Sequence, residues 1–150
     1  IRIAAVLRFN LHLTNIDIMN DKISTTKNKV VLEYTLSATS VPMIWDAIAT
    51  APGLAAWFAD SVSMSGKQFE FVWGKHEARI AELINSRQGT YVRFHWLDED
   101  DGTYFEMRIV RNDLTGNYIL EITDFADPDE EDDVRSLWDS SIDALKRCGV

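Results

Sequence analysis

Hydrophobic and polar residues alternate along residues 29–37, the first regular pattern in the chain. Val30, Leu32 and Leu36 fall on one side of this alternation, and Glu33 falls on the other. Because successive side chains of a strand point to opposite faces, the period predicts a strand with one buried face.

Two short helices are expected directly after this strand. Ser40 stands where an N-cap belongs and Pro42 falls in the first turn, which predicts a helix over 40–49. The Ala-Pro-Gly break at 51–53 is expected to end this helix, and residues 54–58 are expected to form the second one.

The pattern then keeps the period of strands for about sixty residues. Turns rich in Gly, Asn and Asp separate the alternating runs, including an Asp-Gly pair at 101–102. The runs predict six antiparallel strands with one apolar face, over 62–64, 69–73, 76–84, 92–96, 105–109 and 120–122.

After residue 128 the apolar period changes to 3.6. Val134, Trp138 and Ile142 fall on one stripe, which predicts a long amphipathic helix over 129–147. Acidic residues occupy its first turn and basic residues its last turn, as the helix dipole favours. This element order is that of an α+β helix-grip fold, in which a curved antiparallel sheet wraps around a long C-terminal helix.

The length of 150 residues fits one domain, expected over 29–150, with residues 1–28 as an N-terminal extension. Residues 1–18 are expected to be a leader, because this segment is too short and polar to span a bilayer and lacks a signal-peptide cleavage pattern. The single cysteine, Cys148, excludes an internal disulfide and favours a cytoplasmic location.

The net charge of −9 comes from two short acidic runs, at 98–101 and 127–133. No Lys/Arg-rich run is present, so we do not expect binding to nucleic acid. We interpret the acidic runs as helix-capping and solubility devices. The alternatives are a surface for a basic protein patch or a weak Ca²⁺ site, although the spacing of an EF-hand is absent.

Three segments resemble a known family. Residues 52–58 resemble the P-x-x-x-x-W-F signature of bacterial START-like (SRPBCC) proteins related to the activator of the heat-shock-protein-90 ATPase. Residues 91–96 resemble that family's strand ending in Phe-x-Trp, and residues 138–145 resemble its closing helix. The resemblance covers about residues 28–147 and implies the START-like version of the helix-grip fold. The superfamily includes lipid carriers, hormone-binding proteins, polyketide cyclases and co-chaperone domains, and the fold alone does not choose among them.

Apolar side chains of the predicted strands and of the last helix face one another across the expected interior. A curved sheet around one helix can leave an aromatic cavity for a small apolar ligand. We expect Trp57 and Phe58 to close one mouth of this cavity. The indole N–H groups and the hydroxyls of Tyr34, Tyr104 and Tyr118 are candidate polar anchors. The predicted cavity residues are Phe69, Phe71, Trp73, Phe94, Trp96, Phe105, Met107, Ile109, Leu120, Trp138 and Ile142.

The remaining polar residues point to neither catalysis nor a metal. Catalytic and phosphate-binding motifs are absent from the sequence, and we expect His76 and His95 to be exposed or hydrogen-bonded surface residues. Five strand residues are expected to pair across a solvated outer face. These are Arg79, Arg93, Glu106, Arg108 and Glu121.

The favoured hypothesis is a non-enzymatic binding module, without cofactor or metal, whose cavity takes a small hydrophobic ligand, a lipid or an aromatic metabolite. The second is a co-chaperone-like domain that binds a protein partner, and a homodimer remains open. The third is a cyclase-type enzyme, which two or more inward-facing titratable residues would favour.

Overall fold

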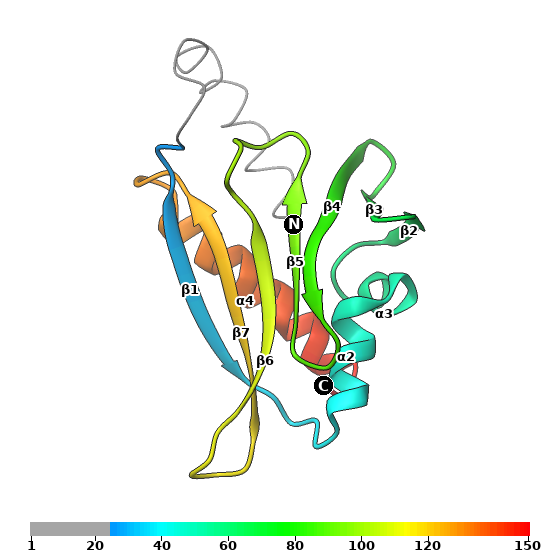
Figure 1. Cartoon of the computed structure of the whole chain (residues 1–150), viewed down its shortest axis with the longest axis vertical. Helices are drawn as coiled ribbons and strands as arrows, with labels where there is room; N and C mark the ends of the chain where they lie inside the picture. Colours follow the sequence, from blue (N-terminus) through cyan, green and yellow to red (C-terminus); the bar gives the residue numbers. More distant parts are fainter. Residues whose placement is uncertain (1–24) are drawn as a thin grey trace.

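Seven antiparallel strands form one curved sheet that wraps around a long helix (Figure 1). The structure is a computed structural model and describes residues 25–150. The strand order is β1-β7-β6-β5-β4-β3-β2, which confirms the predicted helix-grip fold. The strands are β1 Asn28–Thr35, β2 Ser61–Ser65, β3 Gln68–Trp73, β4 Glu77–Arg87, β5 Tyr91–Trp96, β6 Phe105–Arg111 and β7 Tyr118–Ala126.

All seven predicted strands are present, and all of them except β1 are longer than predicted. β4 continues to Arg87, and β7 spans Tyr118–Ala126. Polar residues in these extensions resemble a turn in the sequence, yet the backbone hydrogen bonds of a sheet do not depend on side-chain polarity. The β4–β5 register shifts between Leu83 and Asn85, as at a β-bulge.

Helix α4 spans Glu131–Arg147 and crosses the concave face of the sheet (Figure 1). Its apolar stripe is fully buried, whereas the opposite side of the helix is polar. The first turn carries three acidic residues and the last turn carries Lys146 and Arg147, so both ends match the helix dipole as predicted. The buried stripe consists of Val134, Trp138, Ile142 and Leu145.

Two short helices, α2 (Val41–Ala49) and α3 (Ala51–Ala55), follow β1. The prediction of α2 and of its N-cap Ser40 is confirmed. The prediction of the second helix over 54–58 was wrong, because the helix begins at Ala51 and includes the Pro-Gly pair. Proline is compatible with a first helical turn, and the Thr50 hydroxyl accepts the Gly53 N–H at 3.0 Å as the N-cap.

The predicted leader over 1–18, and most of the predicted extension over 1–28, lie outside the described residues. Thr25 and Lys27 are described, and both bond to the loop between β5 and β6. In this described part of the chain, none of the helices combines the length and the apolar character needed to cross a membrane.

Helices α2 and α3 approach each other at Gly53. A Cβ atom at this position would lie 1.9 Å from the Asp46 carbonyl oxygen. We therefore expect Gly53→Ala to lower the free energy of unfolding by about 2–3 kcal/mol, although alanine normally favours a helix. Urea denaturation measures this loss. Ala55→Gly in the same helix is the control and should cost about 1 kcal/mol or less. A Gly53→Ala protein as stable as the parent would contradict the close approach.

Candidate functional site

The predicted cavity residues gather in one hydrophobic cluster between the sheet and α4. Ten of the eleven are buried, and Ile109 is half-buried against the cluster. They come from β3, β5, β6, β7 and α4, whose inward faces the sequence periodicity identifies. Their aromatic rings contact one another in stacked and edge-on pairs, for example Phe94 with Phe105 at a centroid distance of 5.2 Å. The structure thus brings the whole predicted set together.

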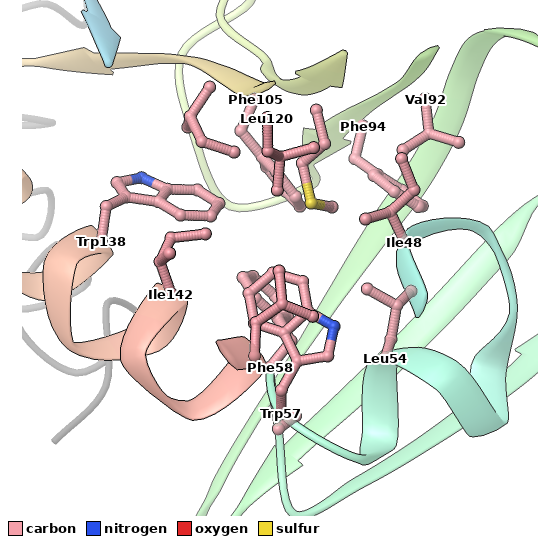
Figure 2. Close-up of a cluster of buried hydrophobic side chains, with 14 of the residues drawn as sticks. Ile48, Leu54, Trp57, Phe58, Val92, Phe94, Phe105, Leu120, Trp138 and Ile142 are labelled. Carbon is pink, nitrogen blue, oxygen red and sulfur yellow. The ribbon is translucent and has the colours of Figure 1, made fainter. Parts of the chain in front are cut away.

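The Phe58 ring lies at the centre of this cluster and not at a mouth (Figure 2). Its centroid is 5.3 Å from that of Phe71 on the sheet and 5.8 Å from that of Trp138 on α4. It also stacks on Phe105 at 5.7 Å. Phe58 therefore joins the two layers, although it belongs to the irregular segment between α3 and β2.

Two indole N–H groups of this interior, those of Trp73 and Trp138, bond to the protein itself. Trp73 Nε1 donates to the Phe58 carbonyl oxygen at 2.9 Å, and Trp138 Nε1 donates to Asp124 Oδ2 at 2.8 Å. The hydroxyl of Tyr34 donates to Asp139 at 2.6 Å, and burial together with this bond raises the pKa of Tyr34. The predicted anchors thus hold the fold together at these positions.

Asp124 is the main inward-facing residue that sequence reasoning missed. It accepts the Phe125 N–H at 2.7 Å as well as the Trp138 indole. Burial raises its pKa to about 6, against the lowering effect of these two hydrogen bonds. The sequence does contain a signal for the inward position of Asp124. Every second residue of a strand lies on the same face, and Asp124 continues the series of Leu120 and Ile122 in β7.

Arg79 also lies on the inner face, which corrects its predicted place on the solvated outer surface. It pairs in register with Phe71, and its side chain is 0% exposed. Its guanidinium carbon lies 4.1 Å from the centroid of the Trp96 ring. Nη2 contacts Asp98 at 2.6 Å and Glu99 at 3.2 Å, while Nη1 is buried without a hydrogen-bond partner among the described residues. Charge alone suggested an outward position, but the cross-strand register decides the face.

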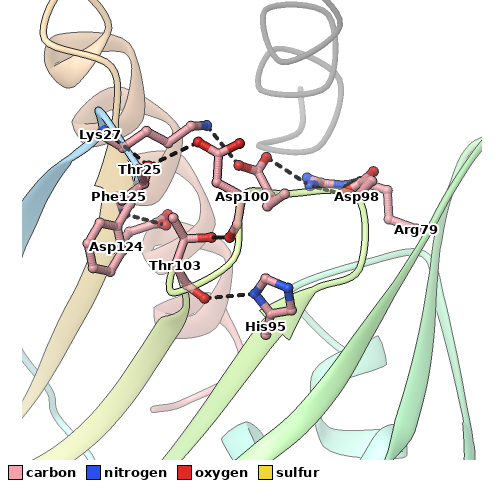
Figure 3. A network of polar contacts seen from close by, with 10 residues as sticks. Thr25, Lys27, Arg79, His95, Asp98, Asp100, Thr103, Asp124 and Phe125 are labelled. Atoms are coloured by element: carbon pink, nitrogen blue, oxygen red, sulfur yellow. Dashed lines mark hydrogen bonds and ion pairs between the residues drawn. The ribbon is translucent and has the colours of Figure 1, made fainter. Parts of the chain in front are cut away.

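The loop between β5 and β6 forms a partly buried polar network with Arg79 and with the residues just before β1 (Figure 3). Lys27 Nζ donates to Glu99 at 2.7 Å, and the Thr25 hydroxyl donates to Asp100 at 3.0 Å. Burial lowers the pKa of Lys27, but the adjacent Glu99 carboxylate has the opposite effect and the net pKa is raised. The interpretation of the acidic run at 98–101 as a solubility device was therefore wrong for Glu99, whose side chain is 6% exposed.

The second acidic run, at 127–133, contains both exposed and buried acidic residues. Asp132 and Asp133 are exposed in the first turn of α4, as predicted. Glu130 is buried, and this burial raises its pKa to about 7. A hydrogen bond to Asp127 and the negative charges of Asp127 and Asp129 act in the same direction.

The outer face carries one predicted cross-strand ion pair, between Arg93 on β5 and Glu106 on β6, and a second ion pair within β6, between Arg108 and Glu106. Arg93 Nη2 contacts Glu106 Oε1 at 2.8 Å, and Arg108 Nε contacts Glu106 Oε2 at 3.1 Å. Two tyrosine rings cover these arginines, since the Arg93 guanidinium lies over Tyr104 and that of Arg108 lies over Tyr91. Glu106 is only 4% exposed, so the prediction that it is solvated was wrong.

His76 and His95 have the predicted surface character. His76 is exposed, and His95 Nδ1 lies 2.7 Å from the Thr103 carbonyl oxygen (Figure 3). Among the residues that the structure describes, no three His, Cys, Asp or Glu side chains gather as a metal site would require.

The burial of Arg79 gives a direct test. Arg79→Gln leaves Asp98 and Glu99 without their guanidinium partner and should lower the free energy of unfolding by about 3–5 kcal/mol. Arg93→Gln is the matched control, because Arg93 is about one-third exposed and its loss should cost about 1 kcal/mol or less. Chemical denaturation compares the two variants, and equal losses would contradict the buried position of Arg79.

Asp124 predicts a pH-dependent stability. Its pKa of about 6 in the folded protein lies above the ordinary 3.8, so the folded state binds the proton more tightly than the unfolded state. Its contribution to the free energy of unfolding therefore falls as the pH rises through this interval. Asp124→Asn keeps only one acceptor oxygen for two donors and should therefore destabilise the protein near pH 4. At pH 7 the same substitution should cost about 2–3 kcal/mol less, because it also removes the unfavourable buried charge.

Urea denaturation at these two pH values measures the difference. Asp132→Asn, which changes an exposed carboxylate, should show no such pH-dependent gain. An Asp124→Asn effect of equal size at both pH values would show that the carboxyl does not titrate as its burial implies.

Comparison with known proteins agrees with this geometry. A family model described as a START-like superfamily domain matches residues 24–149. The protein BfR322 from Bacteroides fragilis, solved by solution NMR, is 47% identical, with a TM-score of 0.60 over 83% of this chain and 92% of its own. A search of curated proteins found no match.

Two more distant structures share the fold. The Aha1 dimer from Colwellia psychrerythraea is 14% identical, with a TM-score of 0.65 over 79% of this chain and 93% of its own. DynU16, a putative protein of the dynemicin biosynthetic locus, is 16% identical, with a TM-score of 0.66 over 79% of this chain and 46% of its own. The family match covers nearly all of the described residues, and on this basis the chain belongs to the START-like superfamily.

Proposed function

We propose that this domain is a non-enzymatic binding module that takes a small hydrophobic molecule, a lipid or an aromatic metabolite, between the inner face of the sheet and α4. Membership of the START-like superfamily supports a ligand-binding role. The predicted cavity residues would form the apolar walls of the site. Aromatic and aliphatic walls with few polar groups are typical of small-molecule pockets.

The observation that carries the proposal is the position of Phe58. Its ring fills the centre of the interior and contacts rings of both layers, yet it belongs neither to the sheet nor to α4 (Figure 2). A change of its side-chain rotamer would free space there without breaking a strand or a helix. An apolar ligand would then replace the ring against Phe71, Phe105 and Trp138, so that the lost ring contacts are exchanged for ligand contacts.

The two inward-facing charged residues bear on the enzyme hypothesis. Asp124 already accepts two hydrogen bonds, from Trp138 and Phe125, and Arg79 is paired with Asp98 and Glu99. Two inward-facing titratable residues meet the condition stated above for the cyclase hypothesis. Groups engaged in this way, however, stabilise the fold and are less suited to act on a substrate, so we favour a binding module over a cyclase-type enzyme. The co-chaperone hypothesis rests on the shared fold alone.

Binding is tested with the full chain and two kinds of probe. The fluorescent amphiphile 1-anilinonaphthalene-8-sulfonate reports on apolar binding, and a series of saturated fatty acids competes with it. We expect one probe molecule per folded chain and displacement by the fatty acids. Phe58→Ala should raise the affinity about tenfold, because the ring no longer competes for its own site.

Val31→Ala is the matched control, since Val31 is an exposed apolar residue on β1 and should leave binding unchanged. Native mass spectrometry confirms the stoichiometry. Binding by neither protein would overturn the proposal. Binding by Phe58→Ala alone would also overturn it, because the site would then be an engineered cavity and not a property of this protein.

A further inference from the structure

The hairpin between β6 and β7 and the C-terminal end of α4 lie at the end of the domain opposite the β5–β6 loop (Figure 1). A second candidate site is lined by residues from this end. It is a groove of about 610 Å³, which is within the range of small-molecule sites. We call it the α4-end groove. Its lining consists of Thr35, Leu36, Ser37, Ala38, Thr39, Arg111, Gly116, Asn117, Tyr118 and Lys146.

The hairpin between β6 and β7 places Arg111 on one wall of the groove. Arg111 pairs in register with Tyr118, and both continue the inward face of their strands. The turn is closed by hydrogen bonds between Asn112 and Asn117 and between Gly116 and Asn112. Gly116 has a φ of 76°, and a Cβ there would lie 3.7 Å from Arg111 Nη2, so the guanidinium lies close to the turn backbone. The opposite wall carries Lys146 from the last turn of α4.

The charge of this lining is opposite to that of the protein. The chain carries 24 acidic residues and a net charge of −9, yet the groove is lined by two cations and by no carboxylate. Neither Arg111 nor Lys146 makes an ion pair with any residue in the described part of the chain. Both cations are therefore available to a ligand.

Several backbone acceptors near the groove are hydrogen-bonded within the protein. The carbonyl oxygens of Leu145 and Lys146, at the end of α4, accept the N–H groups of Cys148 and Gly149. The backbone oxygen of Val150 accepts from the N–H groups of residues 37 and 38. These bonds reduce the repulsion that the negative end of a helix would otherwise exert on an anion.

The other lining groups are suited to a polar ligand. Hydroxyls of Thr35, Thr39 and Tyr118 and the amide of Asn117 can both donate and accept hydrogen bonds, whereas the Ser37 hydroxyl already donates to the Val150 backbone oxygen at 3.2 Å. We propose that the α4-end groove binds a small hydroxyl-bearing molecule through a phosphate or carboxylate group held by Arg111 and Lys146. Both groups are oxyanions that match the donor fork of an arginine. This site is separate from the apolar interior.

Three hexose-derived probes distinguish which anionic group, a phosphate or a carboxylate, the groove binds. Glucose 6-phosphate carries a phosphate, glucuronate carries a carboxylate on the same ring position, and glucose is neutral. Titrations of the full chain by ¹H–¹⁵N NMR at low ionic strength should show binding of one or both anions, with shifts at the lining residues, and no binding of glucose. Higher salt should weaken the binding, because the groove is open to solvent.

The double variant Arg111→Gln/Lys146→Gln should lower the affinity about tenfold or more, because two charge-assisted contacts are lost. Lys67→Gln/Lys75→Gln removes the same charge at exposed positions outside the groove and should change the affinity less than about twofold. The proposal is overturned if neither anion binds, if glucose binds equally well, or if both double variants weaken binding alike.

This test is independent of the proposed interior site. Arg111→Gln/Lys146→Gln should still bind the fluorescent amphiphile, and Phe58→Ala should still bind the hexose anion. Loss of one activity without the other therefore shows which of the two proposals has failed.

Discussion

The structure depends on how the concave face of the sheet is filled. Seven strands present more apolar surface than one helix can cover, since the buried stripe of α4 consists of four residues. Phe58 fills the remaining centre, and its ring contacts place α3 and the segment that follows it against both layers. Protein interiors are packed without large voids, so a curved sheet on one helix requires a third contributor. The same requirement makes Phe58 the side chain on which access to the interior would depend.

Buried charge is the second constraint, and it acts mainly at one end of the domain. Ionised groups are stable away from water only when they are paired and hydrogen-bonded. Arg79, Glu99 and Lys27 meet this condition by bonding to one another and to their neighbours across loops that are distant in the sequence. Among residues 25–150, Asp124 has no ion-pair partner and is stabilised in another way. It accepts two hydrogen bonds, and its raised pKa favours the uncharged form. The opposite end carries the unpaired cations of the α4-end groove, so the two ends of one small domain differ sharply in electrostatic character.

Much of the fold could be predicted because the relevant patterns are local. The alternation in 29–37, the aromatic alternation in 92–96 and the stripe of α4 each require only neighbouring residues. The errors arose where a local signal has two meanings. The Pro-Gly pair at 52–53 was interpreted as a break, although proline also suits the first turn of a helix. Arg79 was predicted on the outer face because it is charged, but it pairs with the inward-facing Phe71 of β3 and therefore lies on the inner face. Asp124 was missed because polarity received more weight than position in the strand.

The sequence by itself determined which apolar residues form the inner face, because side-chain direction follows directly from the period of each strand and helix. It also determined the family, whose motifs are short and continuous. Only the tertiary structure decided which side chain occupies the centre, which acidic residues are buried and which cations remain unpaired. These properties depend on contacts between segments as distant as Lys27 and Glu99, or Arg111 and Lys146, and the spacing of residues along the chain contains no information about such distances.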